Sequence, residues 1–461
     1  MLSISVVVYI AVTSLLGVAC ARFVRSSADF LSASRKLPFA LSSFALFAFW
    51  FGSETVFGAS SEFIQHGFLG VIEDPFGGFL CLFLFALIFV KPLYRSNLIT
   101  LGDLFRRQYG TQVEFVASIF MMLTFFGYIA AQLVALSILL NAVFGLPSML
   151  GISLSAIVVM LYTVLGGMWA VSITDFIQSI VILVGLMGLV VYFSVGLDFS
   201  EVLANAPDGH FRFVPKDGSV RDWLDYWAAW LALGFGSLAS QDIFQRANAA
   251  KSERVAIRST YAGAFMYLIF AMIPLYLGVL VYTISPDLAV GDTQYALTSL
   301  VKQNAPMWLQ VLFYGALLSA IFSTCSGALL APASILAENI LKPLVLREPD
   351  DRKFLRLSRI SVLIIGSMAT VLAFGQSSIY DLVAEASIFG MVSILVPMFC
   401  ALFIRKSRSL GAILSMCAGL SSYLIAAYVL DTEFPALFVG FFAAIAGMAV
   451  GNYLASLGTT H

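Results

Sequence analysis

The sequence predicts an all-α, polytopic membrane protein with thirteen transmembrane helices. Of its 461 residues, 60% are hydrophobic and 11% are charged, and the mean hydropathy is +0.96. Ordinary soluble domains contain about 45–50% apolar and about 25% charged residues. The apolar residues suffice for a dozen or more spans of roughly 20 residues each. This composition excludes a soluble enzyme, a disordered chain and a nucleic-acid-binding protein, and it predicts that the chain lies in a lipid bilayer.

Thirteen apolar runs are long enough to cross a bilayer. They lie near residues 4–21, 38–64, 70–90, 113–141, 149–170, 172–196, 223–245, 259–284, 307–338, 359–375, 381–404, 409–430 and 436–457. The first run has no basic segment before it and no small-residue cleavage site after it. We therefore expect it to be a true span and not a removed signal peptide.

The basic residues predict the orientation of these spans. The loops after spans 1, 3, 7, 9 and 11 contain 21 of the 25 Lys and Arg residues, Arg246 among them, and the opposite side contains four. Cytoplasmic loops carry the excess of positive charge. We expect an integral protein of the cytoplasmic (inner) membrane with its N-terminus outside and its C-terminus inside. The longest external segments, near 197–222 and 285–306, are too short for an ordinary catalytic domain.

Two spans contain polar interruptions close to mid-membrane. Span 2 reads FALFAFWFGSETVFGASSEF, and span 7 reads WAAWLALGFGSLASQDIFQR. A broken helix survives in a membrane only within protein or beside an aqueous cavity. Paired interrupted spans in two halves of a chain indicate a transporter binding site. The alternative is helix packing through small residues, but packing does not require the carboxylates of Glu54 and Asp242.

Two further spans contain candidate functional side chains: span 9 has neighbouring hydroxyl groups, and span 6 has an acidic residue. In span 9, Ala320, Ser323, Thr324 and Gly327 follow i, i+3, i+4, i+7 spacing and share one helix face. Their hydroxyls could bind a cation, or they could bond to their own helix or to a neighbouring one. In span 6, Asp175 is a functional candidate as an intramembrane carboxylate, unless it reaches the interface or caps a helix.

Several segments resemble the sodium:solute symporter family along essentially the whole chain. They are DFLSASRKLP before span 2, LITLGDLFRRQYG after span 3, LGGMWAVSITDFIQ in span 6, DIFQRANAAKS after span 7 and SAIFSTCSGALL in span 9. The segments AFWFGSETVFGASSE, EDPFG and FVKP are most similar to the choline-transporter branch of that family.

The resemblance implies a core of two inverted five-helix repeats, spans 2–6 and 7–11. The chain would then divide into an extra N-terminal helix with its loop (1–37), a first repeat (38–200), a second repeat (201–404) and two extra C-terminal helices (405–461). It also implies a secondary symporter, not an enzyme, that moves a small solute together with Na⁺ by alternating access.

The resemblance carries over a sodium site. Its backbone carbonyl ligands fall on Ala48, Phe51 and Ala320, and its hydroxyl ligands on Ser323 and Thr324. A half-helix C-terminal end presents unpaired carbonyl oxygens, which suit Na⁺. Asp175 matches an aspartate at or near a second site for a cation or a proton in some family members. Ala320 stands where that second site would use a serine.

The substrate expectations rest on matched positions and on charge. Trp50 matches the cage tryptophan of the choline branch, whose second tryptophan falls on Ser240. Thr55 and Asp242 stand where the sugar branch has glutamine and tyrosine, which disfavours a sugar. The candidate substrate residues are Trp50, Glu54, Thr55, Asp74, Ser240, Gln241 and Asp242.

We expect a substrate with an amino or ammonium group, because spans 2, 7 and 9 contain no Lys or Arg at depth to pair with these carboxylates. Such a substrate could be an amino acid, a choline-like amine or a related zwitterion, with Trp50 as a cation–π surface. Alternatively, Glu54 and Asp242 bond to Ser53, Ser240 and Gln241, which leaves an apolar or anion-binding site.

The competing functions are a solute sensor, an intramembrane enzyme, a passive channel and a proton-coupled carrier. His66 and His210 do not form the constellation that an intramembrane enzyme requires.

Overall fold

The computed structural model describes residues 2–216, 218–345, 350–375, 378–430 and 434–457, and these residues form helices and connecting loops with no strand. The long helices are α1 (Leu2–Cys20), α3 (Phe39–Trp50), α8 (Thr111–Phe144), α9 (Ser148–Ser194), α11 (Val220–Gly236), α13 (Glu253–Ile284), α15 (Met307–Ile335), α17 (Asp351–Ala373), α18 (Ile379–Gly390), α20 (Ser409–Tyr428) and α21 (Ala436–Leu457). Shorter helices are α2 (Ser27–Ser32), α4 (Ala59–His66), α5 (Gly78–Leu84), α6 (Val90–Ser96), α7 (Leu101–Tyr109), α10 (Phe199–Ala204), α12 (Gln241–Ala249), α14 (Ala296–Asn304), α16 (Lys342–Val345) and α19 (Val396–Phe403).

The expectation of a polytopic all-α membrane protein is confirmed. Nine helical stretches in the described part of the chain are long and apolar enough to cross a membrane, and Leu2–Thr13 and Phe39–Trp50 are shorter apolar helices. One stretch, α9, covers two of the predicted spans in 47 residues. A straight helix of that length would measure about 70 Å, more than twice the hydrocarbon thickness. Gly167 breaks its regularity with φ 50° and ψ −149°, a conformation that suits glycine.

Both polar interruptions coincide with breaks in the helices. Helix α3 ends at Trp50, Phe51 leaves the helical region with ψ 67°, and a π-helical segment begins at Glu54. Helix α11 ends at Gly236, a 3₁₀ turn follows, and Ser240 is extended with ψ 135° before α12 begins. At these breaks, backbone carbonyl and amide groups lack their helical hydrogen-bond partners. Such groups are available to bind an ion or a polar ligand.

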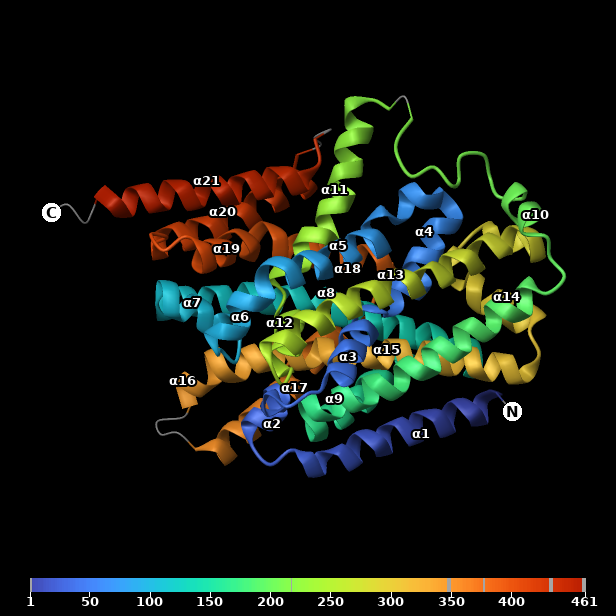
Figure 1. The fold of residues 1–461 in the computed structure, drawn as a ribbon, viewed down its shortest axis with the longest axis horizontal. Coiled ribbons are helices and arrows are strands. Elements are labelled where there is room, and N and C mark those ends of the chain that lie inside the picture. Colours follow the sequence, from blue (N-terminus) through green and yellow to red (C-terminus); the bar gives the residue numbers. More distant parts are fainter. Residues whose placement is uncertain (1, 217, 346–349, 376–377, 431–433, 458–461) are drawn as a thin grey trace.

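The bundle is elongated, and α15 lies at its centre (Figure 1). Every residue from 313 to 335 of this helix is buried. Helix α1 lies along one edge of the bundle against α9 and α15, whereas α20 and α21 pair at the opposite edge (Figure 1). Polar side chains at the middle of α15 are therefore removed from both lipid and water.

The two ends of the bundle differ in what they contain. Helices α6, α7 and α16 lie at one end, and α10, α14 and the start of α1 lie at the other (Figure 1). The first end carries Arg95, Arg106 and Lys342, which pair with Glu253, Glu114 and Glu338 respectively. We refer to this end as the basic end.

Candidate functional site

A cluster of oxygen atoms forms where the end of α3 meets the middle of α15. The Thr324 hydroxyl donates to the carbonyl of Phe49 at 2.8 Å and lies 3.4 Å from the carbonyl of Ala48. Ser323 and Thr324 are completely buried, and Phe51 and Ala320 are buried in the same two segments. The structure thus places Thr324 of α15 beside the carbonyl of Ala48 in α3, two of the residues predicted for the sodium site.

Asp175 joins this cluster from α9. The Ser323 hydroxyl donates to Asp175 Oδ1 at 2.6 Å, and the Asp175 side chain is completely buried. The carboxylate is therefore enclosed by protein and lies in the middle of α9, away from the helix ends. It fixes the orientation of the Ser323 hydroxyl.

Arg246 is the residue that the sequence reasoning misplaced. Its side chain is 1% exposed, and its Nη2 lies 3.6 Å from Asp175 Oδ2. Its Nε donates to the carbonyl of Ala45 at 3.1 Å, and its guanidinium lies 4.0 Å from the centre of the Phe49 ring. The expectation that Arg246 belongs to the loop after span 7 is wrong, because this residue is buried within α12 (Gln241–Ala249). Because α12 turns inward after Ser240, its fifth and sixth residues are buried among α3, α13 and α15.

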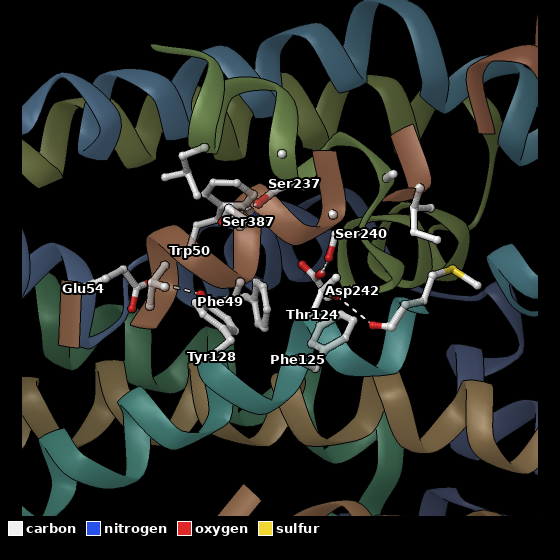
Figure 2. Close-up of a pocket in the computed structure, with 18 of the residues that line it drawn as sticks. Phe49, Trp50, Glu54, Thr124, Phe125, Tyr128, Ser237, Ser240, Asp242 and Ser387 are labelled. Carbon is white, nitrogen blue, oxygen red and sulfur yellow. Dashed lines mark hydrogen bonds between the residues drawn. The ribbon is translucent and has the colours of Figure 1, made fainter. Parts of the chain in front are cut away.

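A cavity lies beside this cluster, between the broken segments and helices α8 and α18. Its wall contains aromatic rings, two carboxylates and several hydroxyls, from Phe49, Trp50, Glu54, Thr124, Phe125, Tyr128, Ser237, Ser240, Asp242, Tyr267 and Ser387. No Lys or Arg is among the described residues that line it. Figure 2 shows Glu54 and Asp242 at opposite sides of this cavity, with Phe49 and Trp50 between them.

The two carboxylates have neutral hydrogen-bond donors. Glu54 Oε1 accepts from the Tyr128 hydroxyl at 2.9 Å, and Glu54 Oε2 accepts from the Gln132 amide at 2.8 Å. Asp242 Oδ1 accepts from the Ser240 hydroxyl. Trp50 Nε1 is a buried donor without a hydrogen-bond partner among the described residues. Buried donors normally find a partner, so a ligand in the cavity could accept from this indole.

Thr55 and Asp74 lie behind the cavity wall. Asp74 accepts hydrogen bonds from Tyr267 and, at 3.2 Å, from Thr55. The Tyr267 ring in turn packs edge-to-face on Trp50, with ring centres 5.9 Å apart. These two predicted substrate residues therefore orient the aromatic wall and do not line the cavity themselves.

Gln241 points away from the cavity, toward the basic end. Its Oε1 accepts from the backbone N–H of Leu101 at 2.8 Å. Nearby, Asn339 accepts from the Thr100 hydroxyl at 2.7 Å and donates to Glu114 at 2.9 Å and to Asp103 at 3.1 Å. We call Thr100, Asp103, Glu114 and Asn339 the Asn339 network. It joins α7 and α8 to the segment after α15, so polar contacts hold these elements together at the basic end.

The sequence reasoning missed four residues of the site: Tyr128, Gln132, Arg246 and Tyr267. Three of them have a visible signal. Tyr128 and Gln132 are four residues apart in an otherwise apolar span, so they share a helix face. Arg246 likewise follows Asp242 by four residues on one face of α12. Tyr267 is one of four tyrosines in its span (259–284), so nothing in the sequence distinguishes it, and only the packing of α13 on α5 reveals its role.

Two helices that break and meet beside a cavity at the centre of a bundle define a membrane transport protein. The chain belongs to the sodium:solute symporter family, whose model matches residues 30–419. Its relatives in this family are symporters and not enzymes.

Individual relatives and solved structures agree with this assignment. The high-affinity choline transporter 1 of Caenorhabditis elegans is 25% identical over 86% of this chain and 71% of its own length. The osmoregulated proline transporter of Bacillus subtilis is 28% identical over 72% of this chain and 68% of its own length. The substrate-bound, outward-open structure of a Na⁺-coupled sialic acid symporter superposes with a TM-score of 0.82 at 18% identity, covering 99% of this chain and 98% of that one. The last comparison establishes the fold.

Proposed function

We propose that the protein is a sodium-coupled symporter that imports a small organic solute bearing an amino or ammonium group. The observation that carries this proposal is the composition of the cavity wall. Glu54 and Asp242 face a cavity whose described lining contains aromatic rings and no basic side chain. A buried carboxylate without a cationic partner is unfavourable by several kcal/mol. An ammonium group supplies the missing charge, and Trp50 adds a cation–π surface.

The adjacent oxygen cluster supports sodium coupling. In this proposal, Na⁺ binds the carbonyls of Ala48, Phe51 and Ala320 and the hydroxyls of Ser323 and Thr324. Na⁺ is a co-transported ion and not a resident cofactor. Asp175 is already paired with Arg246, so we propose that it orients Ser323 and does not bind a second sodium ion.

Transport requires that the cavity open to each side in turn. We propose thirteen spans in the inner membrane, with residues 38–200 and 201–404 as inverted repeats, flanked by residues 1–37 and 405–461. The N-terminus lies outside and the C-terminus inside, so that the basic end faces the cytoplasm. The opposite ends at which α1 begins and α21 ends support this arrangement (Figure 1).

The orientation predicts which loops reach each side of the membrane. Single cysteines introduced at residues 251 and 350 of a cysteine-free variant should react only from the cytoplasm, and one at residue 212 only from outside, because basic loops remain inside. An impermeant thiol reagent applied to intact cells and to inverted vesicles measures this accessibility. The reverse labelling pattern would contradict the topology.

The cavity predicts the class of ligand. In Na⁺-containing buffer, amino acids or choline-like amines should raise the unfolding temperature of the purified protein, and neutral sugars should not. Ligand at 100 times its Kd stabilises the folded state by about 2.7 kcal/mol. Asp242→Asn should weaken amine binding by about 10- to 150-fold, the effect of losing roughly 1.5–3 kcal/mol from a hydrogen bond to a charged group. Stabilisation by sugars or amine-free carboxylates alone would contradict the proposal.

The symport reaction itself is tested in liposomes. Counterflow of a labelled amine that the stability screen identifies should require Na⁺ on the side from which the amine enters. Counterflow that persists when K⁺ replaces Na⁺ and that follows a pH gradient would indicate a proton-coupled carrier. Flux without counterflow would indicate a channel.

A further inference from the structure

Glu54 has two oxygens that face different neighbours. Its side chain lies in the break of the second span and is 4% exposed. Oε1 accepts from Tyr128, a residue of the cavity wall, whereas Oε2 accepts from Gln132. Both partners are neutral, and no ion pair of Glu54 exists among the described residues. The carboxylate is thus buried and oriented but has no counter-charge.

The position of Gly52 relates Glu54 to the sodium site. A Cβ atom placed on Gly52 would lie 2.6 Å from Glu54 Oε2, 2.9 Å from Glu54 Oε1 and 2.8 Å from Thr324 Oγ1. The carboxylate, with Oε2 nearest, and the Thr324 hydroxyl therefore both lie close to one point. Gly52 leaves that point free of side-chain atoms. The hydroxyl of the adjacent Ser53 is also buried and has no hydrogen-bond partner among the described residues.

We propose that Glu54 is shared between the two transported cations, with Oε2 a direct ligand of Na⁺ beside Thr324 and Oε1 facing the substrate ammonium. This inference rests on the proposed function for the presence of both ions. It adds an anionic ligand to a sodium site otherwise built from carbonyl and hydroxyl oxygens. Arg246 does not replace the sodium charge here, because its ion pair is with Asp175, the carboxylate that accepts from Ser323.

A shared carboxylate explains how two cations occupy neighbouring sites. Sodium and an ammonium group repel each other in a small cavity of low dielectric constant. An intervening carboxylate compensates part of that repulsion. In addition, Na⁺ bound at Oε2 further restrains a side chain that Tyr128 and Gln132 already orient, so the substrate bears less of the remaining cost of ordering it. Binding of Na⁺ first would therefore favour binding of the solute.

The test measures sodium binding in the absence of any organic substrate. Equilibrium binding of ²²Na⁺ to purified full-length protein is compared among wild type, Glu54→Gln, Glu54→Asp and the control Glu62→Gln. Glutamine keeps the shape of the side chain and can still accept from Tyr128, but it removes the charge. Aspartate keeps the charge, but its side chain is one methylene group shorter, so the carboxylate lies farther from the sodium site. Glu62 is a carboxylate of the same span that lies beside His66 and is partly exposed.

We expect the Kd for Na⁺ to rise about tenfold or more in Glu54→Gln, since a charged ligand is lost. In Glu54→Asp it should rise by about fivefold or more, because contact is lost although charge remains. Glu62→Gln should remain within about twofold of wild type. A change below fivefold in Glu54→Gln, or wild-type affinity in Glu54→Asp, would overturn direct ligation. If Glu54→Gln does not fold, the aspartate variant decides alone. If the wild-type protein itself binds no Na⁺, sodium coupling and thus the proposed function are contradicted. This result differs from a failure of the Glu54 proposal, in which the wild type binds Na⁺ and the Glu54 variants bind it equally well.

Discussion

Replacing Ser323 and Thr324 together with alanine is expected to weaken Na⁺ binding by about 10- to 150-fold. The change removes two buried hydroxyl oxygens, and one such ligand to a charged group contributes roughly 1.5–3 kcal/mol. Both side chains are completely buried, so water cannot easily take their places. The Thr324 hydroxyl also contacts the carbonyls of Phe49 and Ala48 at the end of α3, and the same proposal assigns the carbonyl of Ala48 to the ion.

The measurement is the sodium concentration that gives half-maximal uptake or binding. Ser326→Ala is a matched control, because this serine lies on the same buried helix but bonds to the carbonyl of Ser323 within it. Its sodium dependence should stay within about twofold of wild type. Unchanged sodium dependence in the double variant would reject the site at α3 and α15. Asp175→Asn should have a smaller effect, because its carboxylate acts on Na⁺ only through Ser323.

Removing the guanidinium of Arg246 is expected to destabilise the protein by about 3–5 kcal/mol, because it leaves Asp175 as an unpaired buried charge. Arg246→Met keeps much of the side-chain volume and the contact with Phe49. Unfolding of the purified protein by denaturant measures the loss. Adding Asp175→Asn to Arg246→Met should recover a large part of the stability, since the uncompensated charge disappears.

An exposed ion pair provides the comparison. Arg95 lies 2.7 Å from Glu253, a shorter distance than in the buried pair, but its side chain is 62% exposed. Exposed pairs contribute about 0–1 kcal/mol, so Arg95→Met should cost no more than that. Equal stability of Arg246→Met and Arg95→Met would contradict the structural importance of the buried pair. Failure of Asp175→Asn to recover stability would show that Arg246 acts through packing instead.

The sequence predicts the breaks of the helices better than the side chains that surround them. Gly52 and Ser53 in one span and Ser237 and Ser240 in another interrupt apolar runs, and the helices break at those positions. Such breaks follow from local backbone chemistry, which neighbouring residues in the chain determine. The approach of α15 to α3 depends instead on packing between segments that are distant in the sequence. Hydrophobic periodicity does not predict this approach, whereas the resemblance to a family does.

Two neighbouring residues at the start of α12 illustrate what the sequence does not predict, namely which side chain faces the cavity. Gln241 and Asp242 are adjacent, and both were candidates for the substrate site. Successive side chains on a helix point about 100° apart, so Asp242 lines the cavity while Gln241 contacts Leu101. Arg246 was assigned to a loop because basic residues usually mark helix ends in membranes. Its burial follows from the inward turn at Ser240, which its own neighbourhood in the sequence does not reveal.

The Asn339 network has a consequence for the speed of transport. A hydrogen bond that is replaced by one to water loses only about 0.5–1.5 kcal/mol, whereas exposing a buried leucine or phenylalanine costs about 1.5–3 kcal/mol. The hydrogen bonds that join Asn339 to Thr100 and Glu114 can therefore be exchanged for bonds to water and re-form with little change in free energy. Gating motions in proteins occur within microseconds to milliseconds. In the proposed symporter, contacts between amide, hydroxyl and carboxylate groups would therefore let the elements at the basic end separate and rejoin on that timescale at every turnover.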